Sequence, residues 1–448
     1  MNPNLLILVI DSFRSDKFYG PQKTSLTPNI DKLLERGVYF SQTISSAPAS
    51  IPAVSSIFTG IYPFQSLELN DNFYALKNGI PNLISLLKKN RYHTTTTIPN
   101  ILKLMQLEKI FDEIESYDDK LTLYDGLGEQ LLEKFEGLKK KSPWLFYLHL
   151  NDIHGQAIFH KNFVHPDFTN KKIGKNQYER MVSLLDIWIG KFLEKINLDE
   201  TLVIITSDHG SDVASFDDDM ETISRTAKEK LVVEKNSVIK SGQKISSKLP
   251  KFFKPLRKTL SKKYKNKRNN IIEKQIHPIL KEIELTQKDP YKKRLLINLL
   301  KSATLPYDER FRIPLLFTGY GINNHKIISK QIRSVDIFPT ILMILKYEHT
   351  FKIHGKKLDI FSTDTLQEEF AFLDSHKNVE EGITQSLIGI RTSEFKYFRD
   401  KLNEKLDVHL YDLKNDPLEI KNISGTNPLK VAEMELIIKK VLNQLYYP

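Results

Sequence analysis

The 448-residue chain has no cysteine, and no stretch of it holds eighteen uninterrupted apolar residues. The absence of cysteine excludes disulfide bonds, thiolate catalysis and zinc sites built from cysteine. Without a long apolar run, a membrane-spanning helix is not expected. The apolar run Leu5–Ile10 is short, follows no basic segment and ends at Asp11, so it predicts a buried strand and not a secretory signal. We therefore expect a cytoplasmic protein.

The charge of the chain is unevenly distributed. Hydrophobic residues make up 40% and charged residues 27%, which is typical of a globular protein, and the length suggests two or three domains. Between Arg225 and Lys301 there are 23 lysines and arginines against 6 acidic residues, an excess of +17. Because the net charge of the chain is +11, the remaining residues carry −6. The basic character therefore belongs to one segment and indicates what that segment binds, not what the whole chain binds.

Three continuous apolar runs predict strands that are buried on both faces of a parallel sheet. They are Leu5–Ile10, Trp144–Leu150 and Leu202–Thr206, and helical patterns separate them. Acidic or histidine side chains occur where each run ends, and they include Asp11, His149, His154, Asp208 and His209. Since the carboxyl ends of parallel strands meet at one edge of a sheet, the sequence predicts a doubly wound α/β fold with one shared active site.

The remaining patterns divide the chain into three expected parts. They are a catalytic α/β domain formed by 1–214 and 304–346, a lysine-rich insertion at 215–303, and a small antiparallel C-terminal subdomain at 347–448. Within them we expect Thr27 to cap a helix that ends near Gly37. Further helices are expected within 80–89, 121–138, 170–196, 332–345 and 430–445, and further strands at 38–40, 93–98, 311–317, 369–373, 387–392 and 395–398.

The stretch from Ser50 to Gly60 predicts a nucleophile at the start of a helix. Ser50-Ile-Pro52 is followed by an apolar run that closes in Thr59-Gly60. A helix beginning there would direct unpaired backbone N–H groups at an anion. Most Ser-x-Pro stretches are ordinary turns, so the interpretation depends on the position of this one between Asp11 and Asp208.

Taken in order, these motifs resemble the sulfatase branch of the alkaline phosphatase superfamily. The resemblance implies a central, mostly parallel sheet flanked by helices, with a small antiparallel C-terminal subdomain; the basic insertion is an addition. The motifs that carry it are Asp11-Ser-Phe-Arg14, Thr27-Pro-Asn-Ile-Asp31, Ser50-x-Pro52, Ser207-Asp208-His209-Gly210, Arg312-Ile-Pro314, Val335-Asp336, Arg391-Thr392 and Asp416-Pro417.

The resemblance also implies a site with one divalent metal ion. Its ligands would be Asp11, Ser50, Asp208 and His209, and Ser50 would also be the nucleophile. The carboxylates suit calcium, magnesium or manganese, whereas the histidine favours zinc or manganese. Histidines of the family contact the ester or protonate the leaving oxygen at the positions of His154 and His149, of which we favour His154. Arg14 and Arg312 are weaker candidates for binding the anion.

Four positions depart from the sulfatase pattern, and one of them is Ser211, where a glutamate commonly follows the Asp-His-Gly. Sulfatases convert the residue at position 50 to formylglycine, and their signature has an arginine four residues later, where this chain has Val54. Ala53 replaces a serine, and Ser12 replaces an aspartate that often binds the metal. An unmodified hydroxyl resembles the superfamily's phospho-transferring branches. We therefore expect a hydrolase or transferase of a sulfate or phosphate ester; the alternative is a non-catalytic glycan- or membrane-binding protein on a degenerate sulfatase fold.

The basic insertion predicts an anionic partner. Residues 251–268 interleave phenylalanine, leucine and tyrosine with lysine and arginine, a composition that favours docking on an anionic membrane surface or binding an anionic glycan or lipid-linked substrate. No nucleic-acid motif accompanies the charge, so no nucleic acid is expected. Membrane docking through 225–301 would place the protein at the inner face of the membrane.

Overall fold

The structure is a computed structural model that describes residues 2–70, 73–155, 165–217, 220, 277–300, 305–362, 367–375 and 386–446. The chain divides into two compact units, one formed by 1–214 with 306–448 and the other by 215–305. In the second unit, α11 (Pro290–Leu300) places Lys292 Nζ 2.5 Å from Asp217 Oδ2. Most of the basic insertion, including 221–276, lies outside the described residues, so its predicted partners stay predictions.

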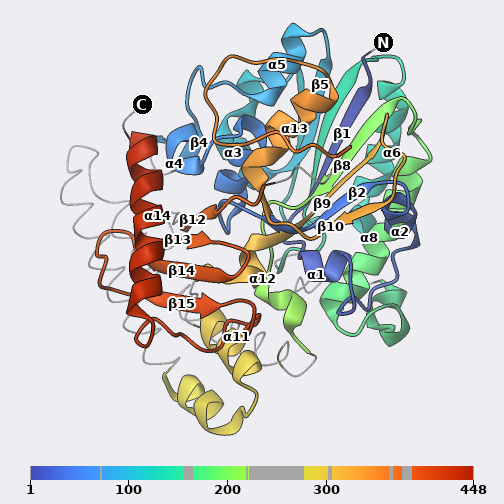
Figure 1. The fold of residues 1–448 in the computed structure, drawn as a ribbon. Coiled ribbons are helices and arrows are strands. Elements are labelled where there is room, and N and C mark those ends of the chain that lie inside the picture. The colour runs from blue at the N-terminus through green and yellow to red at the C-terminus, as the bar shows by residue number, and fades with distance from the viewer. Residues whose placement is uncertain are drawn as a thin grey trace, which may run out of the picture. The chain divides into compact units, whose positions relative to one another are not determined.

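A nine-stranded sheet forms the centre of the first unit (Figure 1). Its order is β10-β2-β9-β8-β1-β7-β5-β6, with β11 also paired to β2. Every pair is parallel except those made by β9, which runs antiparallel to β2 and β8. The predicted α/β fold is therefore confirmed. The strands are β1 (Asn4–Ile10), β2 (Val38–Ile44), β5 (His93–Pro99), β6 (Glu113–Tyr117), β7 (Trp144–Leu150), β8 (Thr201–Thr206), β9 (Arg312–Gly319), β10 (Lys326–Ile328) and β11 (Ile332–Arg333).

Helices cover both faces of the sheet, as Figure 1 shows. Alternate side chains of β1 point to opposite faces, so Leu5, Ile7 and Val9 belong to one buried cluster and Leu6 and Leu8 to the other. This two-sided burial explains why the strand is apolar at every position. One cluster includes residues of α3 (Ser50–Thr59), α5 (Leu83–Lys89) and α13 (Ile337–Ile344), and the other includes residues of α2 (Pro28–Leu34), α6 (Leu127–Leu138) and α8 (Gln177–Leu193).

Two local predictions were wrong, and a third was confirmed in position only. Thr27 is the N-cap residue of α2 and Pro28 follows it, as expected, but the Thr27 hydroxyl donates to Asp31 Oδ1 at 3.1 Å and does not cap a backbone N–H. The helix expected over 121–138 is interrupted at Gly126, whose φ of +88° separates a short 3₁₀ turn from α6. The helix expected from residue 332 begins only at Ile337, because Ile332 and Arg333 pair with β2 as β11 and a 3₁₀ turn follows.

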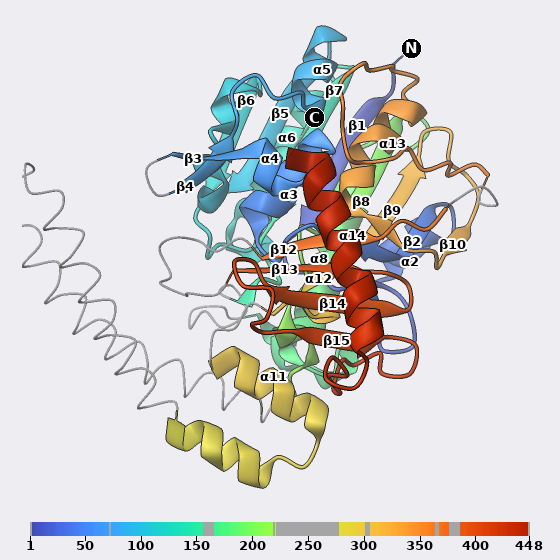
Figure 2. The same cartoon turned by 60° about the vertical axis from the view of Figure 1, so that its left-hand side comes forward.

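The C-terminal part of this unit is a four-stranded antiparallel sheet under one long helix (Figure 2). Met434, Ile438 and Val441 of the helix share a buried cluster with Ile388 and Ile390 of the sheet. No helix within the described ranges is both long and apolar enough to cross a membrane. The elements are β12 (Ala371–Ser375), β13 (Leu387–Arg391), β14 (Phe395–Asp400), β15 (His409–Asp412) and α14 (Pro428–Tyr446).

His354 secures the C-terminal end of α3, at the far end of that helix from Ser50. Its backbone N–H donates to Gly60 O at 2.9 Å, and its Nδ1 accepts from the Tyr62 N–H at 2.9 Å. Burial, aided by the charge of Arg333, lowers the pKa of His354 to about 4. The ring is therefore neutral in the folded protein near pH 7, and it does not belong to the metal site.

We expect His354 to make the protein less stable in acid. An unfolded histidine has a pKa near 6.5, so the unfolded chain binds the proton more tightly, and stability falls as the pH drops from about 6.5 toward 4. In His354→Gln, the loss of unfolding free energy between pH 7 and pH 4.5 should be smaller than in wild type by about 2 kcal/mol. Urea denaturation across that range measures the difference; parallel profiles would contradict the assignment.

Candidate active site

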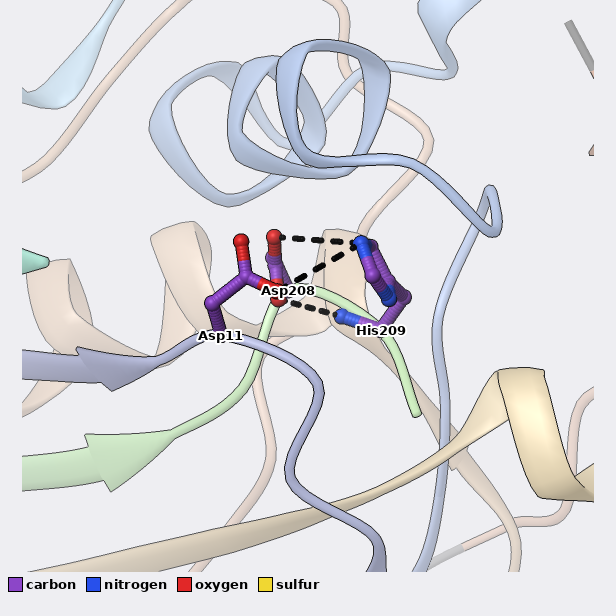
Figure 3. Close-up of side chains that lie close together, drawn as sticks. All are labelled: Asp11, Asp208 and His209. Carbon is purple, nitrogen blue, oxygen red and sulfur yellow. Dashed lines mark hydrogen bonds and ion pairs between the residues drawn. The ribbon is translucent and has the colours of Figure 1, made fainter. Parts of the chain in front are cut away.

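Two buried aspartates lie side by side where two neighbouring strands end. Strands β1 and β8 pair in parallel, with Val9 opposite Thr206, so the residues that follow them meet at one edge of the sheet. One ligand atom from each of Asp11, Asp208 and His209 lies within 4.8 Å of the others. Figure 3 shows the imidazole beside both carboxylates, with ion-pair contacts to each.

The surrounding backbone fixes the Asp208 carboxylate. Its Oδ1 accepts from the backbone N–H of His209 at 2.7 Å and of Ser12 at 3.2 Å. Ser12 also donates from Oγ to Asp11 Oδ1 at 2.7 Å, and its φ of +66° belongs to the left-handed region. Asp208 Oδ2 is buried and has no hydrogen-bond partner among the described residues. Burying a carboxylate oxygen without a hydrogen-bond donor costs folding free energy. A site that binds a cation would leave such an oxygen open for the ion.

His209 presents the nitrogen that a metal would need. Its Nδ1 lies 2.9 Å from Gly210 O, and because a carbonyl only accepts, Nδ1 carries the proton. In the neutral ring Nε2 then offers a lone pair, 3.6 Å from Asp208 Oδ2 and 3.8 Å from Asp11 Oδ1. Burial alone would lower the pKa of His209, but the charges of Asp208 and Asp11 outweigh it and raise the pKa above its usual value.

Ser50 is the first residue of α3 and points at the same group. Its Oγ donates to Asp11 Oδ2 at 3.0 Å. Ala49, the residue before it, offers no side-chain cap, so the first backbone N–H groups of the helix have no capping acceptor there. Val54, one turn further, is wholly buried in the core and supplies no cation. The two carboxylates, the imidazole and the hydroxyl fit a divalent cation by their chemistry.

His149 contacts the same carboxylates. Its side chain is 0% exposed, and Nε2 lies 3.5 Å from Asp11 Oδ2 and 3.8 Å from Asp208 Oδ2. Its Nδ1 lies 2.8 Å from the hydroxyl of Tyr147, a residue that we did not predict, although i and i+2 share one face of a strand. Burial would raise the pKa of Asp11, but the charges of His154, His209 and His149 outweigh it and hold the pKa well below its usual value.

The other predicted residues lie around this group. His154 is near enough for its charge to lower the pKa of Asp11, and 156–164, which follow soon after, lie outside the described residues. Asp152, between the two histidines, accepts from the Leu123 N–H at 2.9 Å, and burial raises its pKa to about 7.

The two predicted arginines have other surroundings. Arg14 makes two contacts of 2.8 Å with Asp16, so its guanidinium is held by a carboxylate of its own segment. Arg312 begins β9 and lines a separate cavity with Asp308 and Arg391. The structure therefore brings together the four predicted metal ligands and His149, while the role of both arginines in binding the anion stays a prediction.

The comparisons with known proteins agree on one family. The family model described as Sulfatase matches residues 3–347, and the model for the C-terminal part of N-sulphoglucosamine sulphohydrolase matches residues 302–446. Arylsulfatase K from Bos taurus is 26% identical over 143 residues, which are 31% of this chain and 26% of that protein. The chain thus spans about a quarter of the length of this curated relative.

Solved structures share the fold over nearly the whole chain. A 2-O GAG sulfatase, BT1596, has a TM-score of 0.64 at 16% identity and covers 99% of this chain and 92% of its own. BT4656, solved with its substrate D-glucosamine-2-N,6-O-disulfate, has a TM-score of 0.63 at 15% identity and covers 99% of this chain and 98% of its own. At such identities the likeness concerns the fold alone.

The arrangement predicts that Asp208→Asn removes metal binding. After EDTA treatment, adding Mn²⁺, Zn²⁺, Ca²⁺ or Mg²⁺ in turn should raise the Tm of the wild type by several degrees for at least one ion, because a ligand that binds only the folded state stabilises it. Asp208→Asn should lose that shift, while its metal-free form should be no less stable than wild type, since one of two adjacent buried charges is gone.

Asp152→Asn is the matched control, because it neutralises a buried carboxylate that lies outside the metal-ligand group. It should keep the Tm shift of the wild type in differential scanning fluorimetry. If Asp208→Asn also kept the full shift, the proposed ligand group would be wrong.

Proposed function

Because this chain belongs to the sulfatase family of sulfuric-ester hydrolases, we propose that it is a metal-dependent hydrolase that cleaves a sulfate ester of an anionic glycan through the Ser50 hydroxyl. The observation that carries this proposal is the 3.0 Å hydrogen bond from Ser50 Oγ to Asp11 Oδ2. It holds a hydroxyl beside two carboxylates and an imidazole, at the start of a helix.

The side chains around Ser50 suit it to nucleophilic attack. A divalent cation held by Asp11, Asp208, His209 and Ser50 would neutralise the anionic ester oxygens and acidify the hydroxyl. The hydroxyl donates to Asp11 Oδ2, which orients the Ser50 oxygen; because the pKa of Asp11 is held well below its usual value, the proton of the acidified hydroxyl passes to solvent water as the oxygen attacks. The bond from sulfur to Ser50 Oγ forms while the bond from sulfur to the leaving oxygen breaks. In the second step the oxygen of water bonds to the sulfur, the bond from sulfur to Oγ breaks, and a proton from the water restores the Ser50 hydroxyl. The free N–H groups of α3 favour an anion at this position.

Different roles follow for the two histidines. The ring of His149 is fully buried against the carboxylates, which suits it to orienting Asp11. His154 is partly exposed and lies near enough to influence Asp11, which suits it to protonating the leaving oxygen. General acid catalysis of this kind contributes about 10²–10⁴-fold to the rate.

A phosphate ester is the second candidate substrate. The observation that favours it is Val54, which fills the core where sulfatases have the arginine of their formylglycine signature. A hydroxyl that stays unmodified can form a phosphoserine and transfer the group to water or to another acceptor. The glycan part of the first proposal is supported by two structural neighbours, of which one is a 2-O GAG sulfatase and the other has D-glucosamine-2-N,6-O-disulfate as its substrate.

Ser50→Ala should abolish turnover, with a loss of at least about 10³-fold, because no other nucleophile is proposed. Ser56→Ala is the matched control: this serine lies on the same buried helix, its hydroxyl hydrogen-bonds to no described group except Pro52 O at 3.4 Å, and the variant should retain activity. Hydrolysis of p-nitrophenyl sulfate and p-nitrophenyl phosphate measures both variants. Full activity in Ser50→Ala would contradict the mechanism.

Mass spectrometry of the peptide spanning 43–68 distinguishes the two substrates. We expect an intact serine. Loss of two hydrogens at Ser50 would indicate formylglycine and favour sulfate hydrolysis alone, whereas a phosphoserine trapped with p-nitrophenyl phosphate would favour the phosphate ester.

His154→Ala should affect poor leaving groups most. Sugar sulfates leave as basic alkoxides that need a proton, so their turnover should fall about 10²–10⁴-fold, while p-nitrophenyl sulfate, with an acidic leaving group, should lose less than about tenfold. His165→Ala is the control, because His165 accepts from the Asp167 N–H at 3.2 Å to cap a short helix, packs edge-on against Tyr124 and contacts none of the proposed metal ligands among the described residues. Equal losses with both substrates would exclude a general acid role.

A further inference from the structure

A polar cavity of about 190 Å³ lies at the start of β9, at the same edge of the sheet as the site but apart from the metal ligands. Its wall includes Arg312, Gln42, Ser329, Ser393 and the ion pair of Asp308 with Arg391. A chain of contacts leads there from the site, because Ser45 Oγ donates to Asp208 O at 2.6 Å and the Ser45 N–H donates to Phe311 O at 2.7 Å, next to Arg312.

The carboxylate of the cavity is fully occupied by its own partners. Arg391 donates from Nε to Asp308 Oδ1 at 2.9 Å and from Nη2 to Oδ2 at 2.8 Å, and Lys396 also pairs with Oδ1. Lys396 Nζ lies 2.9 Å from Glu419 Oε1 as well. Both oxygens of Asp308 therefore have cationic partners, so the negative charge of this wall residue is neutralised by its own neighbours.

The charge of Arg312 is not balanced in this way. No hydrogen bond or ion pair within the described part of the chain holds its guanidinium, although its charge is among those that lower the pKa values of the nearby Asp16 and Asp308. Asp308 forms ion pairs with Arg391 and Lys396, and Asp16 forms an ion pair with Arg14. One unpaired cation thus lines the cavity.

The amide of the wall residue Gln331 is already paired, and the other polar side chains of the wall, apart from Asp308, can donate. Gln42 turns its Oε1 toward Arg391 Nη2 at 3.2 Å, which leaves its amide N–H groups for another partner. The hydroxyls of Ser329 and Ser393 make no hydrogen bond to any described residue. A cavity with a free guanidinium, a free amide and two hydroxyls, and with no free carboxylate, is complementary to an anion.

We infer that this cavity is a second anion subsite and that it binds a sulfate or carboxylate group on a neighbouring unit of a polyanionic oligosaccharide. The inference rests on the proposed function for the first site. Neighbouring strands lie about 4.8 Å apart. The cavity lies beside β9, which is two strands from β1, and β2, which is three strands from β1. This spacing places the cavity roughly 10–15 Å from Asp11. A small aryl sulfate does not span that distance, but a short oligosaccharide does.

The binding of a heparin tetrasaccharide to the full chain carrying Ser50→Ala tests the inference, because that background cannot turn substrate over. Calorimetry should give an affinity that falls about tenfold on adding Arg312→Gln, the loss typical of one charged hydrogen-bonding partner. Adding Arg312→Lys should restore part of it. A higher salt concentration should reduce the difference in affinity between the variants, because salt screens the attraction between the guanidinium and the anion.

Arg36→Gln is the matched control, because it removes the same charge just before the start of β2, at the opposite edge of the sheet, and it should leave the affinity unchanged. The Tm of each variant checks folding. If the Arg312→Gln and Arg312→Lys variants both bind the tetrasaccharide as tightly as the control, the assignment of the cavity as an anion subsite is wrong. If inorganic sulfate loses affinity as much as the tetrasaccharide, the cavity binds a free anion and the assignment to a sugar unit is wrong. Failure of the wild type to hydrolyse sulfate esters would contradict the proposed function alone, since binding is measured separately.

Discussion

The repulsion between two buried carboxylates is the constraint on which the site depends. Ligand atoms of Asp11 and Asp208 lie within 4.8 Å of each other, where two like charges at an effective dielectric constant of about 20 repel by about 3–4 kcal/mol. The protein offsets this repulsion with His149 and His209, with backbone N–H groups on Asp208 and with hydroxyls on Asp11. Among the described residues no hydrogen-bond donor reaches Asp208 Oδ2, and the metal site that we propose would place a cation beside this oxygen.

The strands and their ends could be predicted because burial leaves a clear signal. A strand covered on both faces is apolar at every position, and polar residues at its end mark the edge of the sheet. The runs ending at Asp11, His149 and Asp208 therefore predicted both the α/β fold and the residues that meet. The position of Ser50 depended on motif order, since a Ser-x-Pro stretch alone is typical of turns.

Other features lay beyond the sequence because they depend on side-chain direction or on strand polarity. The apolar run of β9 would be the same in either direction, so its antiparallel pairing was not predicted. Nothing in the order of residues shows that His149 faces both carboxylates, that Asp152 turns to the Leu123 N–H, or that Arg14 is held by Asp16. The free guanidinium of Arg312 likewise follows from the saturation of Asp308 by two other cations.

Anomalous diffraction from crystals soaked in Mn²⁺ and Zn²⁺ tests the central claim most directly, because it locates the ion without reference to activity. The account predicts one peak within about 2.0–2.4 Å of the carboxylates of Asp11 and Asp208, of His209 Nε2 and of Ser50 Oγ. A peak away from these atoms, or a Ser50 hydroxyl turned away from the ion, would contradict the account.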